Sequence, residues 1–362
     1  MTRDELFSLV IPAPDEAARK AAKKRWDGIA KPIDGLGRLE ELICRIAAIE
    51  GREDAQVTPR GLIIMCADNG VVEEGVSQTS QEVTLEVARL MGQKKSSVGV
   101  MTESCPLKAY AVDIGIDSGE TPEGVIDRKV RRGSANIAKG PAMTEEECLR
   151  AVSVGIGLAR KSRDEGCRLL ATGEMGIGNT TTSAALLCAL TGAEPAAVTG
   201  RGAGLSDEGL LRKLAVVERA LELHRKEMGC RQASTQADAL EALRRLGGLD
   251  IAGLAGVFIG GALFGIPVII DGLISATAAL AAEQLAPGCR AYMLASHRGR
   301  EKGTMIALER LGLYPVIDAD LALGEGTGAV LLFPLLDMAM SLYRSGLAFG
   351  EAEIEAYRRF EG

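Results

Sequence analysis

The sequence predicts an α/β fold built on a parallel sheet, and three observations lead to this prediction. Short apolar runs recur along the 362-residue chain from Gly61 onwards, and each run stops at a polar or glycine-rich turn. Helical patterns separate most of these runs, which is the order of elements in a parallel sheet with crossover helices. Ligands of such sheets bind outside the carboxyl ends of the strands, so the polar residues there are the expected site. The six predicted strands are 62–65, 109–112, 169–171, 196–198, 268–270 and 291–295.

Both ends of the chain have helical patterns instead. Residues 1–50 contain a predicted helix over 39–49, whose apolar residues keep the helical spacing. The stretch 331–359 again predicts helices, with a second segment marked by Ile354, Tyr357 and Phe360. We expect the terminal helices to pack together as a small helical domain, 1–50 plus 335–362. The α/β catalytic domain would then cover 51–334.

Composition excludes several classes of protein. The chain is 47% hydrophobic and 25% charged, and its net charge of -7 leaves no basic surface for nucleic acid. The apolar stretch 251–270 contains five glycines and Pro267, which predicts helix, turn and strand rather than a membrane span. Eight cysteines without a C-x-x-C pair and only two histidines predict reduced core thiols and no metal cluster. We therefore expect a cytoplasmic protein with no metal, cofactor or membrane contact.

The stretch 167–190 has the pattern of an anion-binding site. A strand over 169–171 is followed by a glycine loop around Glu174 and by a helix over 183–190. Free backbone N–H groups and the positive end of a helix dipole face such a loop, and phosphate is their natural ligand. The spacing matches neither the Walker loop nor the dinucleotide motif. The glycines and the candidate N-cap residues are Gly173, Gly176, Gly178, Asn179 and Thr180.

Two further turns, 199–204 and 323–329, share this glycine-rich style. Any one of the three is compatible with a simple sharp turn, but three in one chain favour a phosphorylated sugar as ligand. Arg201 and Lys213 could add positive charge to the phosphate. A buried glutamate between glycines is a plausible general base, because burial raises its pKa. Glu325 fits that role, and Glu174 fits it or a role in holding hydroxyl groups.

Seven stretches together resemble the nicotinate-nucleotide:dimethylbenzimidazole phosphoribosyltransferases, which make the lower-ligand nucleotide of cobamides. The stretches follow the family order over nearly the whole chain, and 173–181 (G-E-M-G-I-G-N-T-T) and 323–329 (L-G-E-G-T-G-A) are particularly specific. The other five are 31–40, 67–77, 133–144, 198–205 and 267–272. The resemblance implies a Rossmann-like domain with a small helical domain, a homodimer, and nicotinate mononucleotide and an aromatic base as substrates.

The resemblance also implies roles for individual residues. The general base falls on Glu325, with Glu174 as the second catalytic residue, and the pocket for the base includes Ser77 and Glu86. The phosphate and ribose contacts fall on Gly176, Ile177, Gly178, Asn179, Thr180, Gly202, Gly204, Lys213, Ser296, Leu323 and Gly324.

The implied chemistry agrees with these residue types. The leaving group is a pyridinium that departs neutral at its ring nitrogen, so its departure requires neither an acid nor a metal. A benzimidazole attacks the ribose with one ring nitrogen and loses a proton from the other, which one carboxylate can accept. Attack from the opposite face converts the β-nucleotide into an α-riboside phosphate.

Departures from the family pattern leave the acceptor open. Asn69 replaces a common histidine, Glu86-Val87 replaces Gln-Met, and Gly299 and Thr304 replace serine and histidine. Because Glu86 could add a hydrogen-bond acceptor, another benzimidazole or a purine is an alternative to 5,6-dimethylbenzimidazole. A phenol acceptor and a non-catalytic nucleotide-binding partner subunit are further alternatives. The intact Glu174, Lys213 and Glu325 argue against the partner subunit.

Overall fold

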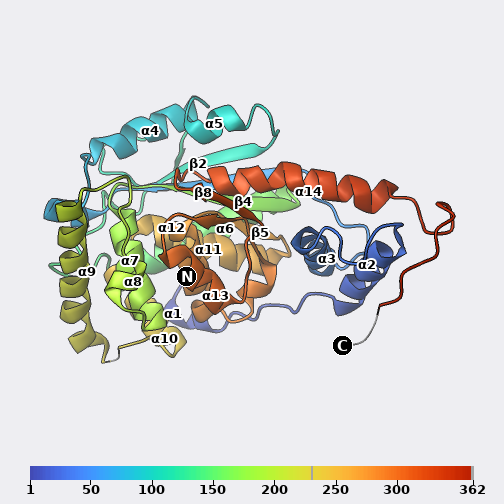
Figure 1. Cartoon of the computed structure of the whole chain (residues 1–362). Coiled ribbons are helices and arrows are strands. Elements are labelled where there is room, and N and C mark those ends of the chain that lie inside the picture. The colour runs from blue at the N-terminus through green and yellow to red at the C-terminus, as the bar shows by residue number, and fades with distance from the viewer. Residues whose placement is uncertain (230, 360–362) are drawn as a thin grey trace.

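A six-stranded parallel sheet forms the centre of the computed structural model, which describes residues 1–229 and 231–359 (Figure 1). The order β3-β2-β1-β4-β5-β6 reverses direction between β1 and β4, as in the Rossmann fold. The predicted fold class is therefore confirmed, with a crevice expected at this reversal. The strands are β1 (Arg60–Ala67), β2 (Lys108–Gly115), β3 (Ile126–Asp127), β4 (Leu169–Met175), β5 (Val268–Ile270) and β6 (Met293–Ala295), and a separate pair joins β7 (His297–Gly299) and β8 (Ile317–Leu321).

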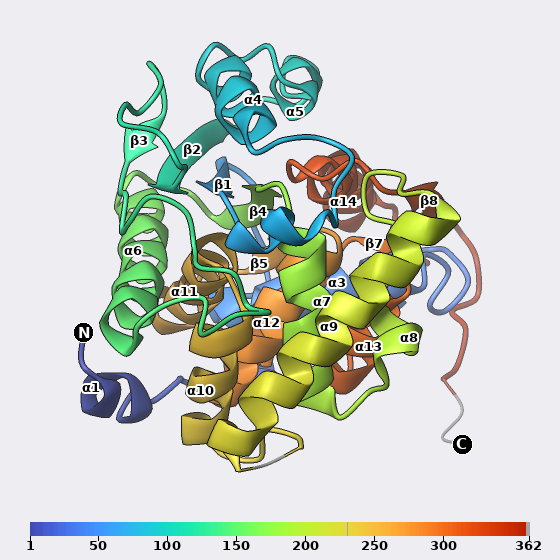
Figure 2. The ribbon, with the colours of Figure 1, turned by 90° about the vertical axis from the view of Figure 1, so that its left-hand side faces the viewer.

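Helices cover both faces of the sheet (Figure 2). Side chains along β1 alternate between two hydrophobic clusters: Ile63 and Met65 belong to one, and Leu62 and Ile64 to the other. The first cluster includes residues of α1 (Arg3–Phe7), α6 (Glu145–Asp164), α7 (Asn179–Thr191), α8 (Pro195–Val198), α9 (Asp207–Met228), α10 (Gln236–Leu246), α11 (Leu249–Phe264), α12 (Leu273–Leu285) and α13 (Gly303–Leu311). The second includes residues of α2 (Glu16–Gly28), α3 (Arg38–Glu50), α4 (Glu82–Gly92), α5 (Ser97–Met101) and α14 (Thr327–Ser345).

Some local predictions were wrong. Residues 196–198 form helix α8 rather than a strand, because Pro195 at its first turn presets a helical φ. Gly173 and Glu174 belong to β4, and α7 begins at Asn179 with Gly178 as its N-cap, so neither Asn179 nor Thr180 caps the helix. No helix covers 354–359, where the chain is irregular; Phe360, the third residue of that predicted pattern, lies outside the described residues. The short strands β3, β7 and β8 were not predicted.

The terminal helices lie beside each other. The rings of Trp26 in α2 and Tyr343 in α14 are 4.9 Å apart, and Arg25 Nε donates to the Tyr343 carbonyl at 3.0 Å. Since α14 runs without a break from Thr327 to Ser345, it crosses the predicted boundary at residue 335. The division into two domains stays a prediction.

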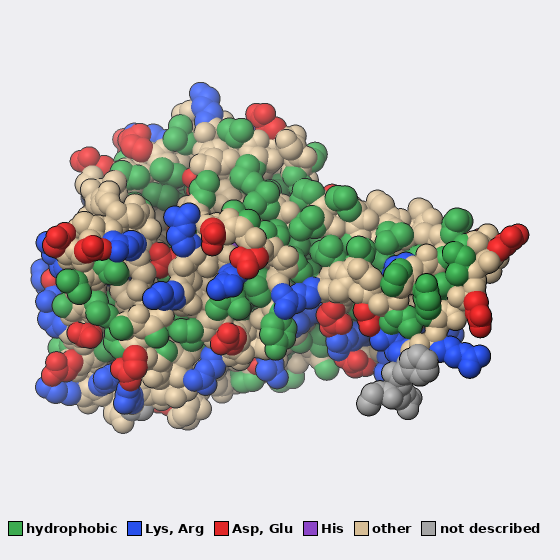
Figure 3. Space-filling view, viewed as in Figure 1, with side chains coloured by type: hydrophobic (Ala, Val, Ile, Leu, Met, Phe, Trp, Pro, Cys, Tyr) green, Lys and Arg blue, Asp and Glu red, His purple; other side chains and the backbone are tan. Residues whose placement is uncertain are grey.

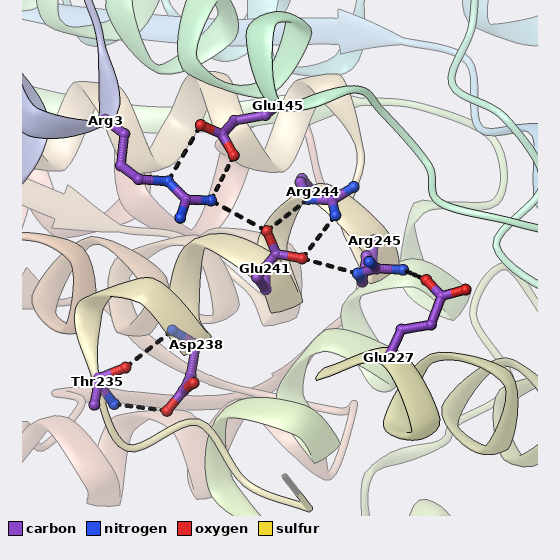
Figure 4. A network of polar contacts seen from close by, with 8 residues as sticks. All are labelled: Arg3, Glu145, Glu227, Thr235, Asp238, Glu241, Arg244 and Arg245. Atoms are coloured by element: carbon purple, nitrogen blue, oxygen red, sulfur yellow. Dashed lines mark hydrogen bonds and ion pairs between the residues drawn. The ribbon is translucent and has the colours of Figure 1, made fainter. Parts of the chain in front are cut away.

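An ion-pair network on the other side of the molecule ties α1 to the helix layer (Figure 4). Arg3 donates to Glu145 of α6 and, at 3.2 Å, to Glu241 of α10. Arg245 Nε in turn donates to Glu241 at 2.9 Å, and its guanidinium also pairs with Glu227 of α9. The network thus links four helices whose apolar faces are already buried.

The stretch 251–270 has the predicted order of helix, turn and strand. It covers most of α11 and all of β5. Among the described residues, the helices are all too short or too polar to cross a bilayer. The seven described cysteines are buried and free, which confirms the predicted core position of Cys44, Cys66, Cys148 and Cys188.

Helices α6 and α11 pack through glycines at unusually short range. A Cβ atom at Gly155 of α6 would lie 2.0 Å from the Gly253 carbonyl oxygen, and one at Gly256 would lie 2.0 Å from the Val152 oxygen. Both contacts are with backbone, which cannot move aside as a flexible side chain would. Only glycine fits at positions 155 and 256 of this helix seam, which consists of Val152, Gly155, Gly253 and Gly256.

We expect Gly155→Ala to lower the free energy of unfolding by about 1–3 kcal/mol, because it forces the two backbones apart. Gly157→Ala is the matched control in the same helix, since a Cβ there meets no atom within 4 Å. The control should gain roughly 0.5–1 kcal/mol of helix propensity. Thermal unfolding followed by circular dichroism measures both, and equal stability of the two variants would contradict the close packing.

Candidate active site

A cavity opens at the carboxyl ends of β4, β5 and β6, where the three predicted glycine turns meet. Its wall is formed by the end of β4, the first turn of α7, the 202–203 turn, the start of α12 and the 321–324 loop. Turns that are far apart in the sequence therefore build one site. The predicted residues on its wall are Glu174, Gly176, Ile177, Asn179, Thr180, Gly202, Leu323 and Gly324.

Four predicted phosphate or ribose residues lie behind this wall. Lys213 is fully buried, and its Nζ donates to Thr180 Oγ1 at 2.8 Å. Gly178 supplies the left-handed N-cap of α7, with φ 96°. Ser296 Oγ donates to the Ile270 carbonyl at 2.6 Å, and the Gly204 carbonyl accepts from the Gln78 amide. Of these four, Lys213 reaches a cavity residue through its charged group.

The charge of Lys213 has one acidic neighbour. Burial lowers the pKa of Lys213 to about 8, and the Glu301 carboxylate acts in the opposite direction. Glu301 Oε1 also accepts from the Gly202 N–H at 2.9 Å. Arg201, the other predicted phosphate partner, instead pairs with Asp207. The cation facing the 202–203 turn is therefore Lys213.

Three carboxyl groups surround the end of β4; Asp250 and Asp271 are buried, and Glu174 is half-buried. Asn179 Nδ2 donates to Glu174 and, at 3.1 Å, to Asp250 Oδ2. Burial raises the pKa of Glu174 to about 8, and the charges of Asp250, Asp271 and Glu325 act in the same direction. Burial likewise raises the pKa of Asp250 to about 6 and that of Asp271 to about 7. Such a site favours a ligand with positive charge, which would stabilise the ionised forms.

Asp271 also fixes the start of α14. Its carboxylate accepts from the Gly326 N–H at 3.2 Å and from the Ala329 N–H at 2.9 Å. His297 lines the cavity nearby, with Nδ1 2.9 Å from Ser296 Oγ. Burial lowers the pKa of His297 to about 4, so its ring is neutral at physiological pH.

Glu325 lies in a strained turn within the 323–327 segment. Gly324 and Thr327 of this segment line the cavity, whereas Glu325 does not. The φ of Glu325 is 59°, between Gly324 at 91° and Gly326 at 88°. A left-handed conformation of this kind costs of order 1–3 kcal/mol for a residue other than glycine, and such strain is typical of functional sites. The side chain is buried, and its Oε2 accepts from the Val98 N–H of α5 at 3.0 Å.

The two predicted base-pocket residues do not reach the cavity. Ser77 Oγ accepts from the Thr79 N–H at 3.2 Å, within its own turn. Glu86 is exposed on α4 and pairs with Arg89 of the same helix. The structure therefore gives no support to the argument that Glu86 alters the choice of base. Helix α4 still contacts the phosphate loop, because Thr84 Oγ1 accepts from the Ile177 N–H at 3.2 Å.

Several site residues were not predicted individually. Asp271 follows β5 directly, so the rule about strand ends could have identified it. Asp250 lies at the start of α11 and Glu301 in the loop after β7, and neither belongs to a recognisable motif. His297 was visible only as one of two histidines. Among the described residues, no three His, Cys, Asp or Glu side chains are placed to hold a metal ion.

Comparisons with known proteins address the family of the chain. A family model described as phosphoribosyltransferase matches residues 11–354. The nicotinate-nucleotide–dimethylbenzimidazole phosphoribosyltransferase of Acetivibrio thermocellus is 44% identical over 336 residues, which are 93% of each chain. The protein of the same name from Ruminiclostridium cellulolyticum is 40% identical over the full length of both chains.

A solved structure extends the likeness to three dimensions. The crystal structure of the enzyme of that name from Thermus thermophilus has a TM-score of 0.86 and 41% identity, covering 94% of this chain and 99% of that one. Identity at this level over nearly the full length is independent of the cavity described above. The chain belongs to the nicotinate-nucleotide–dimethylbenzimidazole phosphoribosyltransferase family.

Proposed function

We propose that the protein transfers ribose 5-phosphate from nicotinate mononucleotide to 5,6-dimethylbenzimidazole, giving α-ribazole phosphate and nicotinate during cobamide assembly. The observation that carries the proposal is the convergence of the three glycine turns on one cavity that is bordered by buried carboxyl groups. The donor phosphate binds at the start of α7, near the Gly202 N–H and Lys213. Both are suited to an anion: one supplies a backbone donor and the other a buried charge.

The buried acids bind the positive part of the donor. Nicotinate mononucleotide carries a pyridinium, and its ribose gains positive charge as the C1′–N bond breaks. Glu174 and Asp271 both line the cavity and stabilise that charge in their ionised forms. The electron pair of the broken bond stays on the ring nitrogen of nicotinate, so that nitrogen loses its positive charge as the group departs.

Glu325 is the general base in this scheme. One benzimidazole nitrogen attacks C1′ from the face opposite to nicotinate, and the proton on the other nitrogen passes to the Glu325 carboxylate. We place the benzimidazole between Glu325 and helix α4. The hydrogen bond from Ile177 to Thr84 holds this helix beside the predicted anion-binding loop that follows β4. Glu325 gives up its hydrogen bond with the Val98 N–H to take this proton.

We also propose a homodimer in the cytoplasm. Figure 3 shows hydrophobic side chains gathered over α14 and α5 on one face of the molecule. The exposed large hydrophobic residues of these two helices are Val100, Leu331 and Met338. A second copy of the chain would bury this apolar surface.

The direct test is product formation by the purified protein from nicotinate mononucleotide and 5,6-dimethylbenzimidazole, followed by chromatography. We expect nicotinate and the α-riboside phosphate in equal amounts. If product forms only with adenine or only with a phenol, the proposed donor site stands and the proposed acceptor is wrong. Nucleotide binding without product from any acceptor would contradict the enzyme and favour the partner subunit.

Glu325→Gln should lower kcat by about 10²–10⁴-fold, because the amide cannot accept the proton. Binding of nicotinate mononucleotide should persist, since Glu325 lies outside the donor cavity. Steady-state kinetics and calorimetry separate the two effects. Glu353→Gln is the matched control, because that exposed glutamate also has a positive φ but lies far along the chain from the site. Unchanged turnover of Glu325→Gln would remove the base assignment.

Binding of nicotinate mononucleotide should release a proton near pH 7. Glu174, with a pKa of about 8, is protonated there in the free protein, and the pyridinium of the ligand favours its ionised form. Affinity should therefore rise as the pH increases to about 8. Lys213, whose pKa is also about 8, already carries its charge near pH 7, so it takes up few protons when the ligand binds. Calorimetry in buffers of different ionisation enthalpy measures the release, and Glu174→Gln should abolish it. Net proton uptake by the unaltered protein would contradict this assignment.

The dimer is tested with Met338→Asp, which places a charge on α14. We expect the unaltered protein to have the mass of two chains by light scattering and the variant to shift toward one. Leu211→Asp on α9 is the control, because Leu211 is 67% exposed and Met338 is 71% exposed. Dissociation by the control alone would place the interface on α9.

A further inference from the structure

Glu301 lies where the proposed function needs an anion to bind. Its Oε1 accepts from the Gly202 N–H at 2.9 Å, and Gly202 faces both Thr180 and Lys213. A Cβ atom at Gly202 would lie 2.9 Å from Thr180 Oγ1 and 3.3 Å from Lys213 Nζ. The Glu301 carboxylate therefore sits at the same donors that would hold a phosphate.

The second carboxylate oxygen of Glu301 is equally informative. Within the described part of the chain, Oε2 is buried and has no hydrogen-bond partner. It lies against Gly200, where an added Cβ would be 1.7 Å away. An unpaired buried carboxylate oxygen is costly, so this position is held by the Gly202 N–H and by the charge of Lys213.

We propose that the Glu301 carboxylate occupies the anion subsite of the free protein, so that a phosphate enters only by displacing it. The inference rests on the proposed phosphate position near Gly202 and Lys213. Glu301 and a phosphate cannot share the Gly202 N–H, and their like charges repel at this range. Glu301 belongs to the loop between β7 and α13, which offers its side chain a way out toward the cavity it lines.

This arrangement weakens the binding of a bare anion to the subsite. Inorganic phosphate gains only the contacts with Gly202, Thr180 and Lys213, and it must displace Glu301 to obtain them. A nucleotide gains the same contacts and also places its pyridinium and ribose near the Glu174 and Asp271 carboxyl groups. The displacement therefore weakens both ligands, but only the nucleotide has further interactions to offset it.

Two variants remove the carboxylate in different ways. Glu301→Gln keeps the shape and loses the charge, whereas Gly200→Ala keeps Glu301 and expels its carboxylate through the added methyl group. Calorimetric titration with inorganic phosphate and with nicotinate mononucleotide gives the affinities. We expect both variants to bind inorganic phosphate roughly tenfold more tightly than the unaltered protein and to bind the nucleotide more tightly by a similar factor, because both ligands displace the same carboxylate. Glu309→Gln, an exposed position on α13, removes the same charge and should change neither affinity.

The outcomes separate this inference from the function on which it rests. Lys213→Met should weaken both ligands if the phosphate subsite is correctly placed. If Lys213→Met weakens binding but Glu301→Gln does not strengthen it, the displacement is wrong and the subsite stands. If Glu301→Gln weakens nucleotide binding, Glu301 is a ribose contact and the inference is overturned. If neither substitution changes binding, the phosphate lies elsewhere and the proposed donor position fails.

Discussion

The Asp271 carboxylate joins the sheet to the turn that carries Glu325. It follows β5 directly, and it accepts hydrogen bonds from the N–H groups of Gly326 and Ala329 at the start of α14. The positive end of that helix favours a carboxylate at this position. Three consecutive residues of the turn are held in left-handed conformations, which need such a restraint to persist. Without it, the orientation of Glu325 and the wall of the cavity at Gly324 would both be lost.

The same restraint has an electrostatic consequence. Asp271 is one of several acids around the end of β4, and burial raises their pKa values enough to keep part of the cluster protonated in the free protein, with repulsion from the neighbouring charges adding to the effect at Glu174. Folding therefore builds a site whose full negative charge develops only when a cation enters. In the proposed donor position, Lys213 on the far side of Thr180 would hold the phosphate apart from the pyridinium.

Most strands of the parallel sheet could be predicted from the sequence, because each strand has a local pattern of apolar residues. The strand ends at Asp68, Glu174 and Asp271 follow buried apolar runs, and a parallel sheet brings such ends together whatever the intervening chain. The wrong prediction of a strand at 196–198 has a local cause as well. A three-residue apolar run is too short to show a periodicity, and the preceding proline favours a helix. Strands β7 and β8 are short and partly exposed, so they lack an apolar pattern.

The acid–amide contacts could not be predicted in the same way. Asp250 and Asn179 are in contact because α7 and α11 start at the same edge of the sheet. Neither segment contains a sequence pattern that predicts contact with the other. The position of Glu301 against Gly200 depends on two loops about one hundred residues apart, as their numbering shows. Roles carried over from the family also said nothing about the resting contacts of Glu325 or Glu86.

The seam between α6 and α11 links packing to chemistry. Helix α11 carries Asp250 at its start and the glycines of the seam one and two turns later. Backbone contact leaves this helix almost no freedom to slide, so the seam sets where the Asp250 carboxylate stands relative to Asn179. A substitution in the seam would therefore resemble a pocket mutation in a genetic screen for lost activity, although no seam residue touches the ligand cavity. Selection for activity would therefore act on glycines of the helix layer that contact only the backbone of the neighbouring helix, as well as on residues that line the cavity.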